Sequence, residues 1–410
     1  MSSLVGRRRL ASRVAELIET RSPFWWVALP LLVIYMLTPT TVAHIDPTTN
    51  AVTGWHLGMT GSVLLPEYQL AIGPDYYRNV GWYVASPRGP VSQYPPGAAA
   101  LAAPFYRIWG QGLTVVEVSG SNRPHVDPIP LGIPPPTPAK LAAAVATAVA
   151  MGLVASTVPL VGGSHLAGVA VGYVGGLATS MWSVSASALW QHGPAAMWVA
   201  LGVYLSARNR LWWAGLAFGA AVLTRPHLAL VAAAVGVAIS LDRRQLAPIL
   251  KLGAGSVLGM VGLVGYNWWL WGEVTFSGGY GTGLTGRLVE GDVLGYLTNL
   301  AGALFDPSRG LLLVSPFLAV LIIGARSGWM KSPPWAKGAA IGAVAYLLVQ
   351  YKANRFSGGE GFTGYRYPLE ALTAAGVLLT LGYLGWVKQR PLAVRVFWLG
   401  VVAAVAIQVV

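Results

Sequence analysis

Residues 139–161 read AKLAAAVATAVAMGLVASTVPLV, an apolar run long enough to cross a lipid bilayer as a single helix. Comparable runs recur along the chain and predict about eleven spanning helices, within a range of roughly ten to thirteen. They lie at 24–43, 139–161, 164–190, 193–207, 211–224, 226–241, 249–271, 311–325, 338–350, 367–386 and 396–410. Residues 97–109 have a helical pattern but are short, which suits a re-entrant segment or a short extra crossing. The predicted fold class is an all-α polytopic membrane protein.

The composition excludes a water-soluble enzyme. Only 10% of the 410 residues are charged and 55% are hydrophobic, whereas a soluble domain has about 25% charged residues. The same balance excludes a disordered chain. Because the chain has no cysteine, it also has no disulfide framework, no thiolate zinc site and no cysteine nucleophile.

Lysine and arginine residues predict the orientation in the membrane. If residues 1–23 are cytoplasmic, alternating spans place the basic connections at 208–210, 243–251, 326–337 and 388–395 on the same side. Acidic and basic residues are then balanced on the outer side, and the whole net charge of +13 is cytoplasmic. This distribution is a topology signal, so the charge does not require a nucleic-acid partner. We predict a multi-pass protein of the plasma (inner) membrane with a cytoplasmic N-terminus.

The predicted outer segments are long and mix both signs of charge with many Tyr, Trp and Gly residues, which favours an extracytoplasmic functional site. They cover 44–96, 110–138, 272–310 and 351–366. Within 44–96, two amphipathic stretches predict interfacial helices, one after Asp46 and one around Glu67–Tyr77. Residues 110–138 are proline-rich and predict an extended surface loop, whose side depends on whether 97–109 crosses. We expect a single transmembrane domain over residues 1–410.

Asp46 follows the first predicted span on the outer side. It can cap the next helix, with Pro47 at the first helical position. It can also act as a general base at the membrane surface and take a proton from an incoming hydroxyl group. Phosphate-binding loops and paired-histidine metal motifs are absent from the sequence, so no metal site is predicted, although a divalent cation is left open.

Several basic residues of the outer side are suited to bind a phosphate group. Lys352, Arg355 and Arg366 lie within fifteen residues of one another, beside a glycine-rich stretch. Further candidates are Arg78, Arg88 and Arg309. The alternative for each residue is a side chain that only reaches the lipid headgroups.

Two more polar residues interrupt apolar helices. Arg225 separates two apolar runs and therefore needs a partner, either a phosphate group or a carboxylate such as Glu360. His192 lies at a helix junction, where its imidazole either caps a helix break or donates a hydrogen bond to a bound phosphate or sugar.

Short motifs follow one another in a fixed order along this topology. After Asp46 come Gln93-Tyr94-Pro95-Pro96-Gly97, Leu189-Trp190-Gln191-His192-Gly193-Pro194, Leu223-Thr224-Arg225-Pro226, Tyr266-Asn267-Trp268, Asp306-Pro307-Ser308-Arg309-Gly310 and Gly364-Tyr365-Arg366-Tyr367-Pro368. Together, over most of the chain, they resemble the GT-C superfamily of integral-membrane glycosyltransferases. That superfamily includes protein O-mannosyltransferases, aminoarabinose transferases and actinobacterial mannosyl- and arabinosyltransferases.

The resemblance implies a GT-C-like fold and transfer of a sugar from a polyprenyl-phosphate carrier to an acceptor hydroxyl outside the membrane, with inversion at the anomeric carbon. The acceptor would be a glycan, a glycolipid or a protein, and no cofactor is implied. Asp46 matches the family's catalytic base. Family members often have two acidic residues in a row there, whereas this chain has Ile45-Asp46-Pro47. A second acid would have to come from elsewhere, and Glu67 and Asp75 are the candidates.

A lipid-phosphate donor needs cations at the outer membrane surface, and the charged and polar residues of the outer side are the candidates for contact with the substrates. The donor phosphate would be held among Lys352, Arg355, Arg366, Arg225, Arg309 and Arg78. The donor sugar or the acceptor would contact His44, Tyr94, Gln191, His192, Glu360 and Tyr365. The main alternative is a transporter or flippase of lipid-linked sugars, which needs a polar path that the spans hardly offer. A scaffold protein would leave the charged outer segments unexplained.

Overall fold

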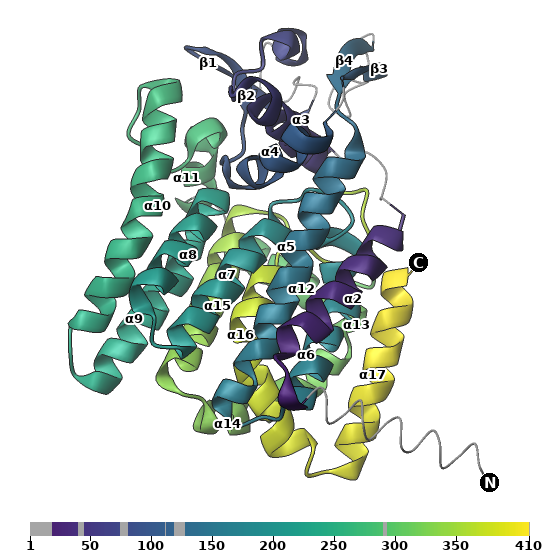
Figure 1. Cartoon of the computed structure of the whole chain (residues 1–410), viewed down its shortest axis with the longest axis vertical. Helices are drawn as coiled ribbons and strands as arrows, with labels where there is room; N and C mark the ends of the chain where they lie inside the picture. Colours follow the sequence, from purple (N-terminus) through teal and green to yellow (C-terminus); the bar gives the residue numbers. More distant parts are fainter. Residues whose placement is uncertain are drawn as a thin grey trace.

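The computed structural model describes residues 19–39, 45–73, 81–110, 112–118, 128–289 and 293–409. Long helices run side by side in one bundle, and two small β-hairpins lie together with α3 (Ile45–Thr60) and α4 (Gly97–Trp109) at one end of it (Figure 1). We call this end the loop end. The opposite end, where exposed Arg208, Arg243 and Lys388 lie between helices, is the basic end.

Each of the eleven predicted spans contains a helix. These helices are α2 (Pro23–Leu37), α5 (Pro136–Thr157), α6 (His165–Leu177), α7 (His192–Ala207), α8 (Leu211–Thr224), α9 (Ala229–Arg243), α10 (Ala247–Trp271), α14 (Phe317–Lys331), α15 (Pro334–Ala353), α16 (Leu369–Gly382) and α17 (Pro391–Val409). Within the described residues, 5 helical stretches have the length and hydropathy of a membrane span: Pro136–Val161, Pro226–Arg243, Ala247–Trp271, Leu369–Val387 and Pro391–Val409. The predicted all-α, multi-pass membrane architecture is confirmed.

The predicted helix at 164–190 is wrong in its second half. α6 ends at Leu177, and a π-helical turn at Met181–Ser185 leads into an irregular stretch up to Gln191. Two serine side chains of this stretch bond to residues distant in sequence: the Ser180 hydroxyl accepts from the Tyr365 N–H, and the Ser183 hydroxyl donates to the Thr363 carbonyl. Serine competes with helical bonding in this way. Residues 178–191 therefore form a buried support beneath the loop at 354–368.

Residues 97–109 do not cross the bundle. They form α4, which packs against α3 at the loop end (Figure 1). The two helices approach closely because Gly58 has no side chain: a Cβ there would lie 2.4 Å from the Ala103 carbonyl oxygen. The described part of 110–138 pairs β3 (Thr114–Val118) with antiparallel β4 (Ile129–Ile133), also at the loop end. The proline-rich stretch is thus partly a hairpin instead of an extended loop.

The second predicted interfacial helix is short. Pro66–Ala71 form a 3₁₀ turn, η1, and residues 74–80 lie outside the described part of the chain. A second hairpin follows, in which β1 (Tyr83–Ser86) pairs with antiparallel β2 (Gly89–Ser92). Its tip rests on the end of α10, where Arg88 Nε donates to the Trp269 carbonyl at 2.6 Å. Arg88 therefore fastens the hairpin to the bundle.

The segment 272–310 contains α11 (Thr282–Val289) and α12 (Val293–Phe305), and the short α13 (Leu311–Val314) follows it. α12 packs beside the end of α15, because Asn299 Nδ2 donates to the carbonyls of Tyr351 at 2.6 Å and Asn354 at 2.9 Å. Asn299 Oδ1 also accepts from the Phe356 N–H at 2.7 Å. This one side chain fixes the start of the 354–368 loop.

Candidate active site

The loop at 354–368 has a backbone that only glycine adopts readily. Gly358, Gly359, Gly361 and Gly364 have φ values of 68°, 94°, 79° and 84°. Arg309 fixes the second half of the 354–368 loop, because its Nη1 donates to the carbonyls of Phe362 at 2.5 Å and Gly364 at 3.1 Å. The resulting turn carries Arg366 to the start of α3.

Asp46 and Arg366, 320 residues apart in sequence, form an ion pair at this place. Arg366 Nη1 donates to Asp46 Oδ2, and the indole N–H of Trp82 donates to Asp46 Oδ1. α3 begins at Ile45, so Asp46 lies in its first helical turn, and its carboxylate faces Arg366 and Trp82. The structure thus brings the predicted base and one predicted phosphate-binding residue into direct contact.

Aromatic rings surround the Arg366 guanidinium. Its Cζ lies 5.0 Å from the ring centroid of Trp190, 5.1 Å from that of Tyr367 and 5.8 Å from that of Phe362. Burial lowers the pKa of Arg366, but the neighbouring Tyr367 and Asp46 outweigh burial and raise that pKa above its ordinary value. Arg366 is therefore a permanent cation, held by an anion and by ring faces.

Tyr94 adds a neutral hydroxyl beside the carboxylate. Burial, followed by the Asp46 charge and a hydrogen bond to it, raises the pKa of Tyr94 well above its usual value. The phenol therefore stays protonated at physiological pH. Among the predicted donor or acceptor contacts that the structure describes, Tyr94 lies at Asp46.

A second buried cluster centres on Glu370 in the first turn of α16. Glu370 Oε1 lies 2.9 Å from His192 Nδ1 and 3.3 Å from Arg225 Nε, and Oε2 accepts from the Tyr346 hydroxyl at 3.0 Å. Arg225 Nη2 also donates to Gln350 Oε1 at 2.5 Å. The partner of Arg225 is thus Glu370, and the choice of Glu360 was wrong.

The other predicted phosphate-binding residues have different surroundings. The Lys352 ammonium lies 5.7 Å from the ring centroid of Tyr296, and Arg355 is exposed. Arg309 lies close enough to Arg366 for burial and the Arg366 charge to lower the pKa of Arg309. Arg78 falls outside the described residues. Arg309 and Arg366 therefore bring two positive charges close together at this loop.

Glu67 is placed away from Asp46. Its Oε2 lies 3.6 Å from His56 Nε2, and His56 is ten residues further along α3. At 1.5 Å per residue, that is about 15 Å along the helix. Glu67 is therefore poorly placed to assist Asp46, and the other candidate, Asp75, lies outside the described residues.

The remaining predicted contacts have varied surroundings. Tyr365 is buried, and its hydroxyl lies 2.9 Å from Ser315 Oγ, which indicates a structural role. Gln191 is buried after Trp190, and Glu360 is exposed on the glycine-rich loop. His192 belongs to the Glu370 cluster, and His44 lies outside the described residues. Their roles in substrate binding stay predictions.

Sequence reasoning missed Glu370, Trp82 and Gln350. Glu370 could have been identified from the sequence, because burying an acidic residue inside an apolar span costs free energy unless the residue has a partner. Trp82 and Gln350 had none, because their importance depends on contacts with residues far away in sequence. Among the described residues, no group of three or more His, Asp or Glu side chains could hold a metal ion.

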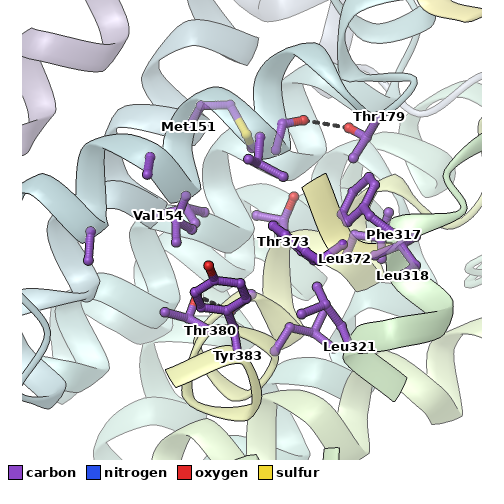
Figure 2. Close-up of a pocket in the computed structure, with 18 of the residues that line it drawn as sticks. Met151, Val154, Thr179, Phe317, Leu318, Leu321, Leu372, Thr373, Thr380 and Tyr383 are labelled. Atoms are coloured by element: carbon purple, nitrogen blue, oxygen red, sulfur yellow. Dashed lines mark hydrogen bonds between the residues drawn. The ribbon is translucent and has the colours of Figure 1, made fainter. Parts of the chain in front are cut away.

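A cavity of about 200 Å³ lies inside the bundle and contains none of the predicted site residues (Figure 2). Its walls come from α5, α6, α14, α16 and α17 and are mostly aliphatic or aromatic. The hydroxyls of Thr179 and Thr380 donate to carbonyls of their own helices, at 2.5 Å and 2.8 Å. The cavity therefore offers a hydrocarbon surface, which does not suit a sugar or a phosphate group.

The molecule is thus a multi-pass helical membrane protein with a carboxylate–arginine site at its loop end. No protein-family model and no curated protein matches the chain. Among solved structures it is similar to ArnT from Cupriavidus metallidurans bound to undecaprenyl phosphate, with a TM-score of 0.50 and 16% identity over 89% of this chain and 61% of ArnT. The same protein in the apo state gives a TM-score of 0.48 and 17% identity over 88% of this chain and 58% of ArnT.

The chain therefore spans about six-tenths of the length of ArnT. At this level of identity the likeness concerns the fold. It confirms the GT-C-like fold that the sequence resemblance predicted.

Proposed function

We propose that the chain is a glycosyltransferase that moves a sugar from a polyprenyl-phosphate carrier to an acceptor hydroxyl on the outer face of the membrane. The observation that carries the proposal is the Asp46–Arg366 pair, which joins the expected base to a permanent cation at the loop end. The fold shared with ArnT, whose crystal structure holds undecaprenyl phosphate, supports the carrier class.

The pair supplies what a direct displacement needs. Asp46 takes the proton from the acceptor hydroxyl, and the hydroxyl oxygen attacks the anomeric carbon of the sugar. The bond between that carbon and the phosphate oxygen breaks, and polyprenyl phosphate leaves with the bonding electron pair. Arg366, with the positive charge of Arg309 nearby, stabilises the charge that develops on the phosphate. One base suffices, because phosphate leaves without a separate acid.

Purified protein tests the reaction. With a labelled polyprenyl-phosphate sugar and an extract of cell-envelope acceptors, we expect the label to move to the acceptor while polyprenyl phosphate is released. Proteoliposomes test the transporter alternative in parallel. Movement of the intact labelled carrier across the membrane, without release of polyprenyl phosphate, would identify a flippase and refute the proposal.

Single cysteines test the side of the membrane, because the native chain has none. Thr60 and Arg355 are exposed at the loop end, and Gln245 is exposed at the basic end. In intact cells, cysteines at Thr60 and Arg355 should react with an impermeant maleimide, whereas one at Gln245 should react only after lysis. The reverse pattern would place the site in the cytoplasm.

A further inference from the structure

Both oxygens of the Asp46 carboxylate are already engaged. Oδ1 accepts from the Trp82 indole, and Oδ2 accepts from the Arg366 guanidinium. Hydrogen bonds and a positive charge both favour the ionised form of a carboxylate, so a carboxylate in this setting is a weak base. Asp46 becomes a stronger base towards an acceptor hydroxyl when it loses its positively charged partner.

Arg366 is the partner that can leave. Besides the bond to Asp46, Arg366 Nη2 donates to the Tyr367 hydroxyl at 3.3 Å, beyond the usual range for a strong bond. Within the described part of the chain, its buried Nε has no hydrogen-bond partner. Its remaining neighbours are ring faces, which attract a cation without fixing the direction of its N–H groups. The guanidinium can therefore turn among these rings while keeping their attraction.

Gly358 packs directly against the Arg366 side chain. A Cβ at Gly358 would lie 2.7 Å from Arg366 Nε and 3.0 Å from Arg366 Cγ. A side chain at this position would therefore push Arg366 from its place, whereas glycine does not obstruct it. The unpartnered Nε therefore lies against glycine instead of a bulky neighbour.

We propose that Arg366 acts as a latch: its guanidinium holds the Asp46 carboxylate until the phosphate group of the donor binds the guanidinium and displaces Asp46. This inference rests on the proposed function. The phosphate takes Nη1 together with Nη2, the two N–H groups that the end of a guanidinium offers to an oxyanion as a fork. Asp46 Oδ2 then loses its charged partner and faces the acceptor hydroxyl. The base becomes effective only after the donor has bound, so the donor binds before the acceptor.

The latch lowers the affinity of the free protein for the carrier phosphate. Asp46 and the phosphate compete for the same guanidinium, so the free protein is mostly in a form that must open before the carrier binds. When only a fraction of the molecules is in the form that can bind the carrier, the apparent affinity for the carrier is reduced by that fraction. Neutralising the proposed base should therefore tighten the binding of the carrier phosphate while it abolishes transfer.

The experiment measures the Kd of undecaprenyl phosphate for purified protein in detergent micelles. Asp46→Asn should bind about tenfold more tightly than wild type, because an uncharged amide competes only weakly with the phosphate for the guanidinium. Asp46→Ser, which also removes the charge, should change affinity in the same direction. Arg366→Gln should bind more weakly than wild type, and the double variant should resemble Arg366→Gln. Glu67→Gln is the matched control, since it removes a carboxylate of the same helical region that pairs with His56.

Unchanged or weaker binding by the folded Asp46 variants would overturn the latch, because Asp46 would then hold Arg366 in place for the phosphate. Wild-type protein that binds no undecaprenyl phosphate would be a different result. It would refute the proposed function itself, and the latch with it.

Discussion

The molecule contains two carboxylate–arginine pairs that differ in how completely they are enclosed. The Asp46 and Arg366 side chains are 11% and 13% exposed, whereas those of Glu370 and Arg225 are 0% and 8% exposed. The first pair joins the 354–368 loop to α3, outside the bundle. The second joins α16 to the end of α8, inside it.

Their side-chain contacts differ in number. Glu370 accepts from the Tyr346 hydroxyl and lies 2.9 Å from His192 Nδ1 and 3.3 Å from Arg225 Nε. Arg225 also reaches Gln350 and His192, at 2.5 Å and 3.2 Å. In the described structure, Arg225 and Arg366 alike keep a buried Nε without a hydrogen-bond partner. The many contacts around Glu370 and Arg225 maintain the packing of the helices. Arg366, which has fewer side-chain partners and lies at the edge of the bundle, can exchange partners, as substrate binding requires.

Removing the charge of Asp46 should have the largest effect on function. Asp46→Asn should lower transfer by about 10²- to 10⁴-fold, the usual contribution of a positioned base. Asn keeps one oxygen for Trp82 or Arg366, so the variant should remain folded in size-exclusion and thermal-melt measurements. A folded variant with wild-type turnover in the labelled-sugar assay would remove Asp46 from the chemistry.

Removing Glu370 should have the largest effect on stability. Glu370→Ala leaves Arg225 buried without a counter-charge, and breaking a buried pair in this way costs about 3–5 kcal/mol. The double variant Glu370→Leu/Arg225→Met, which buries no charge, should recover most of that loss. Denaturant unfolding in mixed micelles measures both variants. A double variant no more stable than Glu370→Ala would show that the charges are not the reason for the loss.

Gly358→Ala should have a smaller, local effect. The positive φ of Gly358 and its closeness to Arg366 both oppose a side chain, so the donor KM should rise and stability should fall by about 1 kcal/mol. Gly61→Ala is the matched control, because Gly61 has a similar φ of +74° and nothing within 4 Å of an added Cβ. Equal changes in donor KM for the two variants would attribute the effect to backbone strain alone.

Glu67→Gln should have the smallest effect. Glu67 pairs with His56, well along α3 from Asp46, so transfer should stay at the wild-type rate. Initial rates at saturating and limiting donor check this. A loss comparable to that of Asp46→Asn would restore Glu67 as the second acid and contradict the placement of α3.

The sequence predicted the bundle well, because apolar runs of bilayer length determine spanning helices with little help from tertiary contacts. It predicted Asp46 and Arg366 separately, from their motifs, but not their contact. The break after Leu177 was missed because the side chains of Ser180 and Ser183 bond to residues of the 354–368 loop, far away in sequence. Local periodicity carries no information about such partners.

A structure of the protein with bound undecaprenyl phosphate would show directly whether the phosphate displaces Asp46 from Arg366. We expect a phosphate oxygen within hydrogen-bond distance of the Arg366 guanidinium, and no hydrogen bond from Arg366 to Asp46. A phosphate bound elsewhere, for example at the basic end, with the Asp46–Arg366 pair intact, would contradict this expectation.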